Sequence, residues 1–144
     1  MNKYNDLEIS LLSCILIKPE LMEEVVLDDK YFIKTKRIWL FMKSFYKKFG
    51  TFDLTLMCSV VKEKYQLVNY LEKILDVEPT PALFQKYQQQ LIDLYNEKEK
   101  DKIIIEKTYE LANELLLRNI TPFEFKKQID YLYENIDEVF ENKN

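Results

Sequence analysis

The chain has 144 residues, of which 47% are apolar and 14% aromatic, and its formal net charge is −4. This length and composition supply enough apolar material for one domain with a core of its own. A chain with this small negative net charge is not expected to attract nucleic acid through its overall charge. One glycine and four prolines are too few turn residues for a β-sandwich or β-barrel. The composition therefore predicts an all-α fold.

The sequence lacks the residues that most enzyme sites require. It contains no histidine, which excludes Ser-His and Cys-His pairs and histidine metal ligands. A single glycine excludes the glycine-rich phosphate loops GxxxxGK[ST] and GxGxxG. The acidic pairs Glu23-Glu24 and Asp28-Asp29 lie at a predicted helix end, where solvated carboxylates are common. We therefore expect no catalytic activity, no cofactor and no metal site.

The apolar runs are short, and none approaches the roughly 20 residues that a membrane-spanning helix needs. Both cysteines, Cys14 and Cys58, lie in apolar helical runs, which is typical of small buried side chains in a reducing compartment. These features predict a soluble, cytoplasmic protein without a disulfide.

Residues 1–98 are predicted to form a helical globule of about five helices. The first helix begins at Asn5, and Glu8 completes a capping box. Residues 11–17 of this helix are apolar on nearly every face, as in a helix that others surround. Pro19 is suited to the first position of a short second helix, and apolar periodicity predicts further helices over 54–65 and 67–75.

The third predicted helix lies within residues 31–53 and has two distinct faces. Gly50 follows it at the position where a left-handed residue ends a helix, and Asp53 can cap the next helix. The face of this helix that points away from the core is basic, and Leu40 is an apolar residue within that basic face. The predicted core stripe contains Ile38, Phe41, Met42, Phe45 and Phe49.

The basic face of this helix has three open interpretations. It is a solvated surface, a protein-binding surface, or a site for single-stranded nucleic acid in which Trp39 stacks on bases and lysines follow the phosphates. Trp39 is expected at the border of this face. The candidate residues are Lys36, Trp39, Leu40, Lys43 and Lys47.

The stretch 81–117 contains no glycine and, after its first residue, no proline, so it predicts one helix about 55 Å long. Its apolar seam is interrupted at 96–102, a run without any apolar residue. Ion pairs at i,i+3 spacing can keep this run helical as a bridge between two separately packed parts; a loop at 96–102 is the alternative. The expected pairs are Glu97 with Lys100 and Glu99 with Lys102.

Residues 99–144 are predicted to form an antiparallel helical hairpin, continuous with the globule through the helix 81–117. Asn119 is expected to take a left-handed conformation in the turn, and Thr121 with Glu124 to form a capping box. One apolar seam then runs to Val139. Two helices cannot bury so wide an apolar surface by themselves, so we expect the hairpin to pack against another copy or another protein. The predicted association residues are Ile105, Tyr109, Ala112, Leu116, Phe125, Ile129, Leu132 and Ile136.

The order and spacing of these features resemble the N-terminal domain of the DnaB-type bacterial replicative DNA helicases. The resemblance spans nearly the whole chain. Trp39 stands where that family usually has Phe, and the family's Gly pair before Tyr70 is absent. The matching features are Glu8 to Ile17 with Lys18-Pro19-Glu20, Tyr31-Phe32, Ile38-Trp39, Met42, Phe45-Tyr46, Phe52-Asp53-Leu54, Tyr70-Leu71, Ile74-Leu75, and Pro79 to Tyr87 leading into a long helix and hairpin.

This resemblance implies a non-catalytic domain in which neighbouring subunits of a ring pair through their hairpins and the resulting collar binds the primase. We therefore expect an assembly module of DNA replication, a component of the primosome, that forms homo-oligomers or docks on the replicative helicase or the primase, with weak or no direct DNA binding. Because the family's linker and RecA-type motor do not follow here, we expect either a helicase fragment or a stand-alone module.

Three other functions remain open at this point. The first is a helical protein that binds single-stranded nucleic acid. The second is a phage or mobile-element protein that modulates a host helicase. The third is a helical adaptor unrelated to replication.

Overall fold

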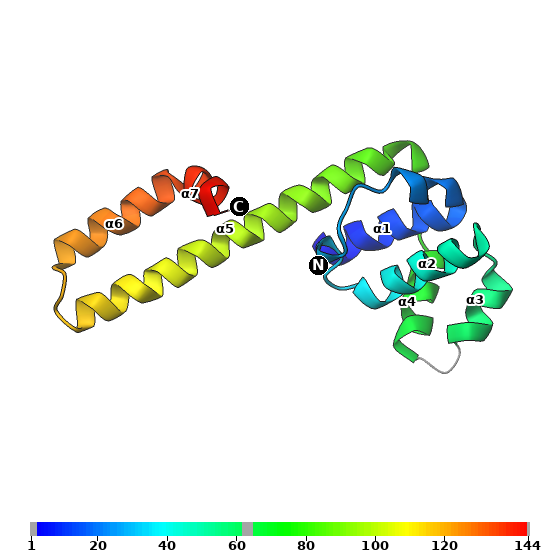
Figure 1. Cartoon of the computed structure of the whole chain (residues 1–144), viewed down its shortest axis with the longest axis horizontal. Helices are drawn as coiled ribbons and strands as arrows, with labels where there is room; N and C mark the ends of the chain where they lie inside the picture. Colours follow the sequence, from blue (N-terminus) through cyan, green and yellow to red (C-terminus); the bar gives the residue numbers. More distant parts are fainter. Residues whose placement is uncertain (1–2, 62–64, 144) are drawn as a thin grey trace. The chain divides into compact units, whose positions relative to one another are not determined.

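A computed structural model describes residues 3–61 and 65–143, and over these residues the chain forms helices joined by turns, with no strand (Figure 1). The all-α fold predicted from composition is confirmed. Three short segments are 3-10 helices: η1 (Pro19–Glu24), η2 (Asp29–Tyr31) and η3 (Pro81–Leu83). The α-helices are α1 (Lys3–Ile17), α2 (Lys36–Phe49), α3 (Leu54–Val61), α4 (Tyr65–Leu75), α5 (Phe84–Leu116), α6 (Pro122–Glu134) and α7 (Ile136–Lys143).

The structure divides into two compact units, residues 1–94 and residues 95–144, and α5 contributes to both. The long helix predicted over 81–117 is confirmed, with a 3-10 first turn in η3 followed by α5. The polar run 96–102 is helical, so the loop alternative is wrong. Lys102 lies 3.2 Å from Glu99, as the i,i+3 spacing predicts, whereas Lys100 pairs with Asp137 at 2.7 Å.

Helix α1 lies at the centre of the 1–94 unit. Leu11, Leu12, Cys14 and Ile15 are all fully buried, because α1 packs against η1 on one side and α4 on another. The hydroxyl of Ser13 also donates to the Ile74 carbonyl at 3.0 Å, which ties α1 to α4 inside the core. The prediction that other helices surround this segment is therefore confirmed.

The boundary between α2 and α3 follows the signals in the sequence. Gly50 has φ +69° and its amide donates to the Tyr46 carbonyl at 2.7 Å, so it ends α2 in the left-handed conformation. The Asp53 carboxylate accepts from the Leu56 amide at 2.8 Å and caps α3. Both predictions are confirmed.

One predicted helix start in the first 30 residues is wrong, and a second predicted helix starts as expected but is a short 3-10 helix. Helix α1 begins at Lys3, so Asn5 lies inside it rather than at its start, and the Glu8 carboxylate bonds to the amides of residues 34 and 35. The predicted start at Pro19 is confirmed, but the helix is the 3-10 helix η1 and ends at Glu24. The buried side chain of Gln88 bonds to backbone groups at that end. The Gln88 amide oxygen accepts from Val26 N at 2.9 Å, and its nitrogen donates to Glu24 O at 3.2 Å.

Two apolar side chains of the α2–α3 region are more exposed than the sequence predicts. Phe49, expected in the core stripe, is 46% exposed because it lies in the last turn of α2, although it still packs on Phe45 with ring centroids 4.6 Å apart. Cys58 is exposed because the neighbouring Met57 takes the core-facing position of α3. Residues 62–64 of the predicted helix 54–65 lie outside the described residues.

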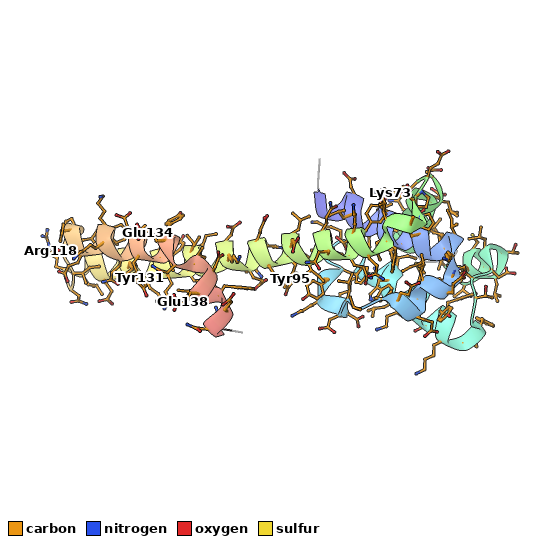
Figure 2. The ribbon with its side chains drawn as sticks, turned by 90° about the horizontal axis from the view of Figure 1, so that it is seen from above. Lys73, Tyr95, Arg118, Tyr131, Glu134 and Glu138 are labelled. Carbon is orange, nitrogen blue, oxygen red and sulfur yellow. The ribbon has the colours of Figure 1, made fainter. Side chains whose placement is uncertain are left out.

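In the 95–144 unit, α5 and α6 run antiparallel and are joined by a short turn (Figure 1). The single seam predicted to reach Val139 breaks at Asn135, which has φ −117° and ψ 20° and separates α6 from α7. Figure 2 shows α7 turned away from the direction of α6 between Glu134 and Glu138. A straight α6 would lay its last apolar residues along the polar run 96–102, which offers them no apolar partner.

Helix α7 has half-buried apolar residues, Ile136, Val139 and Phe140, and also contacts charged side chains. Lys100 pairs with Asp137, and its ammonium lies 5.5 Å from the centre of the Phe140 ring. Lys143 lies 3.7 Å from Glu106. Over the part of the chain that the structure describes, no helix has both the length and the apolar character that crossing a bilayer requires.

Candidate interaction surfaces

The start of α2 is fixed by a buried carboxylate from α1. Glu8 has no exposed surface, and its Oε1 accepts from the amides of Lys34 and Thr35 at 3.0 and 3.1 Å and from the Thr35 hydroxyl at 2.9 Å. Burial raises the pKa of Glu8, and the hydrogen bonds from Thr35 and Lys34 oppose that shift. Glu8 therefore orients α2, a role that the sequence analysis missed. The signal was an acidic residue on the same helical stripe as Leu11 and Leu12.

Trp39 is not part of the exposed face of α2, which corrects its expected position at the border. It is 2% exposed and stacks on Phe32, with ring centroids 4.3 Å apart and planes at 14°. Its indole nitrogen donates to Asp29 Oδ1 at 2.8 Å. Since its ring face is covered and its only polar atom is bonded, Trp39 is unavailable for stacking on a nucleic-acid base.

Acidic side chains line one edge of the basic face. Lys43 lies 2.8 Å from Asp29 Oδ1 and 5.6 Å from the centre of the Trp39 ring. The hydrogen bonds from Lys43 and Trp39 lower the pKa of Asp29. At the same edge the Tyr46 hydroxyl donates to Glu23 at 3.1 Å, which raises the pKa of Tyr46. The basic face is thus partly neutralised along this edge.

The turn between α5 and α6 is built from two local motifs. Arg118 takes φ +61°, the Asn119 amide donates to Glu114 O, and the Arg118 amide donates to Leu115 O, a pattern that closes a helix C-terminus. Arg118 rather than the predicted Asn119 is therefore the left-handed residue. After the turn, the Thr121 hydroxyl accepts from Glu124 N at 3.1 Å and Glu124 accepts from Thr121 N at 3.1 Å, so the predicted capping box is confirmed.

The eight predicted association residues fall into three levels of exposure. Leu132 is 6% exposed and lies inside the hairpin, so it is unavailable to a partner. Ala112, Phe125, Ile129 and Ile136 are half-buried. The exposed fractions of the remaining three are 57% for Ile105, 71% for Tyr109 and 80% for Leu116.

Four of these residues, Ile105, Tyr109, Ala112 and Leu116, form what we call the hairpin stripe. They follow one another at spacings of four, three and four residues, which places them on one side of α5. Three of the four are large and mostly exposed. The hairpin stripe is therefore an apolar surface that residues 95–144 leave in contact with water.

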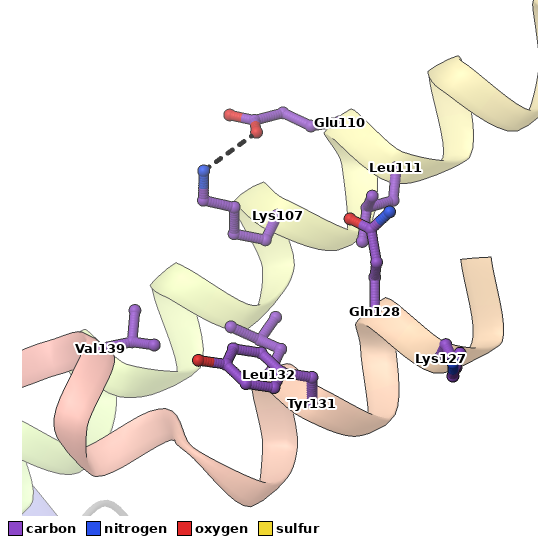
Figure 3. Close-up of a pocket in the computed structure, with 8 residues that line it drawn as sticks. All are labelled: Lys107, Glu110, Leu111, Lys127, Gln128, Tyr131, Leu132 and Val139. Carbon is purple, nitrogen blue, oxygen red and sulfur yellow. Dashed lines mark hydrogen bonds and ion pairs between the residues drawn. The ribbon is translucent and has the colours of Figure 1, made fainter. Parts of the chain in front are cut away.

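A groove with a volume of about 530 Å³ opens on another side of the hairpin. Figure 3 shows that α5, α6 and α7 all contribute to it, with Leu111 and Leu132 near its floor and a Lys107–Glu110 ion pair at 3.3 Å on its rim. Lys107 and Glu110 lie roughly 140–200° around α5 from Ile105, so the groove and the hairpin stripe are separate surfaces. The lining residues are Lys107, Glu110, Leu111, Lys127, Gln128, Tyr131, Leu132 and Val139.

Neither surface has the features of a catalytic centre. Within residues 3–61 and 65–143, no three acidic or cysteine side chains are grouped so that they could hold a metal ion. The Cys14 thiol is buried, and burial raises its pKa to about 11, which leaves it unreactive.

A family model described as the DnaB-like helicase N terminal domain matches residues 1–93 of the chain. No curated protein and no solved structure gave a match. The matched residues cover about two thirds of the 144 residues and end next to the boundary between the two units at residue 94. The hairpin stripe and the groove lie outside the matched residues.

Proposed function

Since the chain belongs to the DnaB-like helicase N-terminal domain family, we propose that it is a non-catalytic assembly module of DNA replication that associates with a second copy of itself through its hairpin. Family membership, which confirms the resemblance found in the sequence, supports the link to a helicase. A replicative helicase or a primase is the further partner that the resemblance implies.

The composition supports a non-catalytic role. The 144 residues contain no histidine and only one glycine, and a phosphate-binding loop of an ATP-driven motor needs at least two glycines at fixed spacing. This composition is suited to a protein that binds other molecules rather than one that catalyses a reaction.

The observation that carries the proposal is the exposure of the hairpin stripe. Burying a large apolar side chain contributes about 1.5–3 kcal/mol, whereas association costs at least about 4 kcal/mol in lost translational and rotational freedom. Ile105, Tyr109 and Leu116 must therefore be buried together to give a stable pair. Their shared position on α5 allows one partner helix to cover all three.

Light scattering as a function of protein concentration tests the proposal. We expect the wild-type chain to form a dimer or a larger species, and Leu116→Glu and Tyr109→Glu to shift the midpoint to at least about tenfold higher concentration, because each places a charge in an apolar contact. Leu132 is unsuitable for this test, since its burial means that a charge there would disrupt the hairpin itself.

The matched control is Gln128→Glu, which adds the same charge at an exposed position of α6 that lines the groove. Its association should equal that of the wild type. A wild-type chain that remains monomeric at the highest attainable concentration, or a Gln128→Glu variant weakened as much as Leu116→Glu, would contradict pairing through the hairpin stripe.

A further inference from the structure

Helix α2 carries a second apolar and basic surface, which we call the α2 face: Lys36, Leu40, Lys43 and Lys47. Their spacings of four, three and four residues place them on one side of the helix over about 16 Å. All four side chains are exposed, including Leu40 at 41%. No acidic residue occurs anywhere in α2. The α2 face is therefore a basic helix surface with one partly exposed apolar side chain at its centre.

The aromatic residues beside this face are already engaged. Trp39 is buried against Phe32 and bonded to Asp29, and the Tyr46 hydroxyl is bonded to Glu23. Binding to single-stranded nucleic acid relies on aromatic rings that stack on successive bases. The α2 face offers lysines without such a ring.

The charges at the edge of the face also favour a protein over a polyanion. A nucleic-acid backbone that crossed the α2 face would approach Asp29 and Glu23, whose carboxylates occupy the Lys43 edge. A folded acidic segment can place its charges against Lys36 and Lys47 and avoid that edge. Leu40, between the lysines, then needs an apolar side chain opposite it.

We propose that the α2 face binds an acidic amphipathic helix of a partner protein, with carboxylates that meet Lys36 and Lys47 around one apolar residue that covers Leu40. Helices pack side by side when residues at i, i+4, i+7 and i+11 on each form matching rows. The four residues of the α2 face have this arrangement. They belong to the matched family region, whereas the hairpin stripe does not, so this proposal does not rest on the proposed association.

The test is fluorescence anisotropy with a labelled helical peptide of about 18 residues that carries Glu, Leu, Ala and Glu in the same spacing as the α2 face, so that no carboxylate lies opposite Lys43 and its partner Asp29. A second peptide has the same composition, with these four residues distributed around the helix. An oligothymidine is the third probe. We expect the patterned peptide to bind, and Leu40→Ser and Lys47→Glu each to weaken it by about tenfold.

Two control variants match those changes elsewhere in the 1–94 unit. Leu83→Ser removes an apolar side chain of similar exposure, 38%, and Lys86→Glu reverses an exposed lysine; both should bind like the wild type. Thermal unfolding of each variant checks that it folds. The proposal is overturned if the patterned peptide does not bind at low salt, if the two peptides bind equally, if the Leu40→Ser variant binds as well as Leu83→Ser, or if oligothymidine binds more tightly than the patterned peptide.

Discussion

The two units of the molecule bury their apolar residues very differently. In the 1–94 unit, one continuous core runs from Ile9 to Leu91 and includes the fully buried rings of Phe32 and Trp39. In the 95–144 unit, Ile103 and Leu132 are the large apolar residues below 10% exposure among those described. Large apolar side chains that remain mostly exposed there include Tyr109, Leu116, Leu117, Phe123, Tyr131 and Tyr133.

This difference indicates what each unit needs. Several helices around α1 can enclose a core without help, whereas a pair of helices presents more apolar surface than it can cover. The hairpin compensates with local motifs, such as the Thr121 capping box, and with ion pairs such as Lys100–Asp137. Its remaining apolar surface is the reason to expect a partner.

The largest expected effect on the free energy of unfolding is the difference between replacing a buried leucine of the 1–94 unit and an exposed leucine of the 95–144 unit. Leu12→Ala should lower the free energy of unfolding by about 3 kcal/mol, because it leaves a cavity in the core. Leu116→Ala should lower it by less than about 0.5 kcal/mol while the chain is monomeric, since Leu116 is 80% exposed. Urea unfolding followed by circular dichroism measures both. If both variants lost the same free energy of unfolding at low concentration, the two units would not differ in burial as described.

The second contrast concerns the buried carboxylate of Glu8. Glu8→Ala should lower the free energy of unfolding by about 2–3 kcal/mol, because the amides of Lys34 and Thr35 lose their acceptor. Glu8→Gln keeps the accepting oxygen and removes the buried charge, so it should be within about 1 kcal/mol of the wild type. Urea titrations at neutral pH separate the two. An alanine variant as stable as the glutamine variant would show that Glu8 does not hold the start of α2.

Burial of Glu8 also predicts in which direction the stability of the folded state changes with pH. Because burial raises its folded-state pKa above 4.5, the folded state binds a proton more tightly than the unfolded state. The resulting stabilisation is fully present below pH 4.5 and is lost as the pH rises through the raised pKa. Relative to Glu8→Gln, the wild type should therefore lose stability as the pH rises from 4.5 through the raised pKa of Glu8. A difference that stays constant over this range would contradict the buried charge.

A smaller effect compares the two left-handed residues, one from each unit. Gly50→Ala should destabilise the chain by about 1 kcal/mol; no atom lies within 4 Å of the added Cβ, so the strain is in the backbone alone. Arg118→Gly should stabilise the hairpin by about 0.5–1 kcal/mol, because it relieves that same strain at φ +61°. Thermal unfolding measures both. A destabilising Arg118→Gly would show that the arginine side chain contributes more than its backbone conformation costs.

Features set by neighbouring residues could be predicted from the sequence. The capping box at Thr121, the left-handed Gly50 and the Asp53 cap depend on three or four consecutive residues, and the structure has all of them. The long helix was also predictable, because nothing between 82 and 116 interrupts it.

Features that depend on distant residues were not predictable in this way. The helical wheel placed Trp39 at a border, but Phe32 and Asp29 cover it from another segment. Glu8 fits a local capping box in the sequence, yet its carboxylate bonds to residues 34 and 35. The break at Asn135 separates α6 from α7, and the apolar spacing of residues 125–139 alone does not reveal it.

Amide hydrogen exchange at increasing protein concentration tests most directly whether another molecule covers the hairpin stripe. We expect exchange over residues 104–116 of α5 to slow as the concentration rises, while exchange over residues 36–49 of α2 stays unchanged. Leu116→Glu should abolish the slowing. Exchange over residues 104–116 that is independent of concentration would show that these residues do not form an association surface.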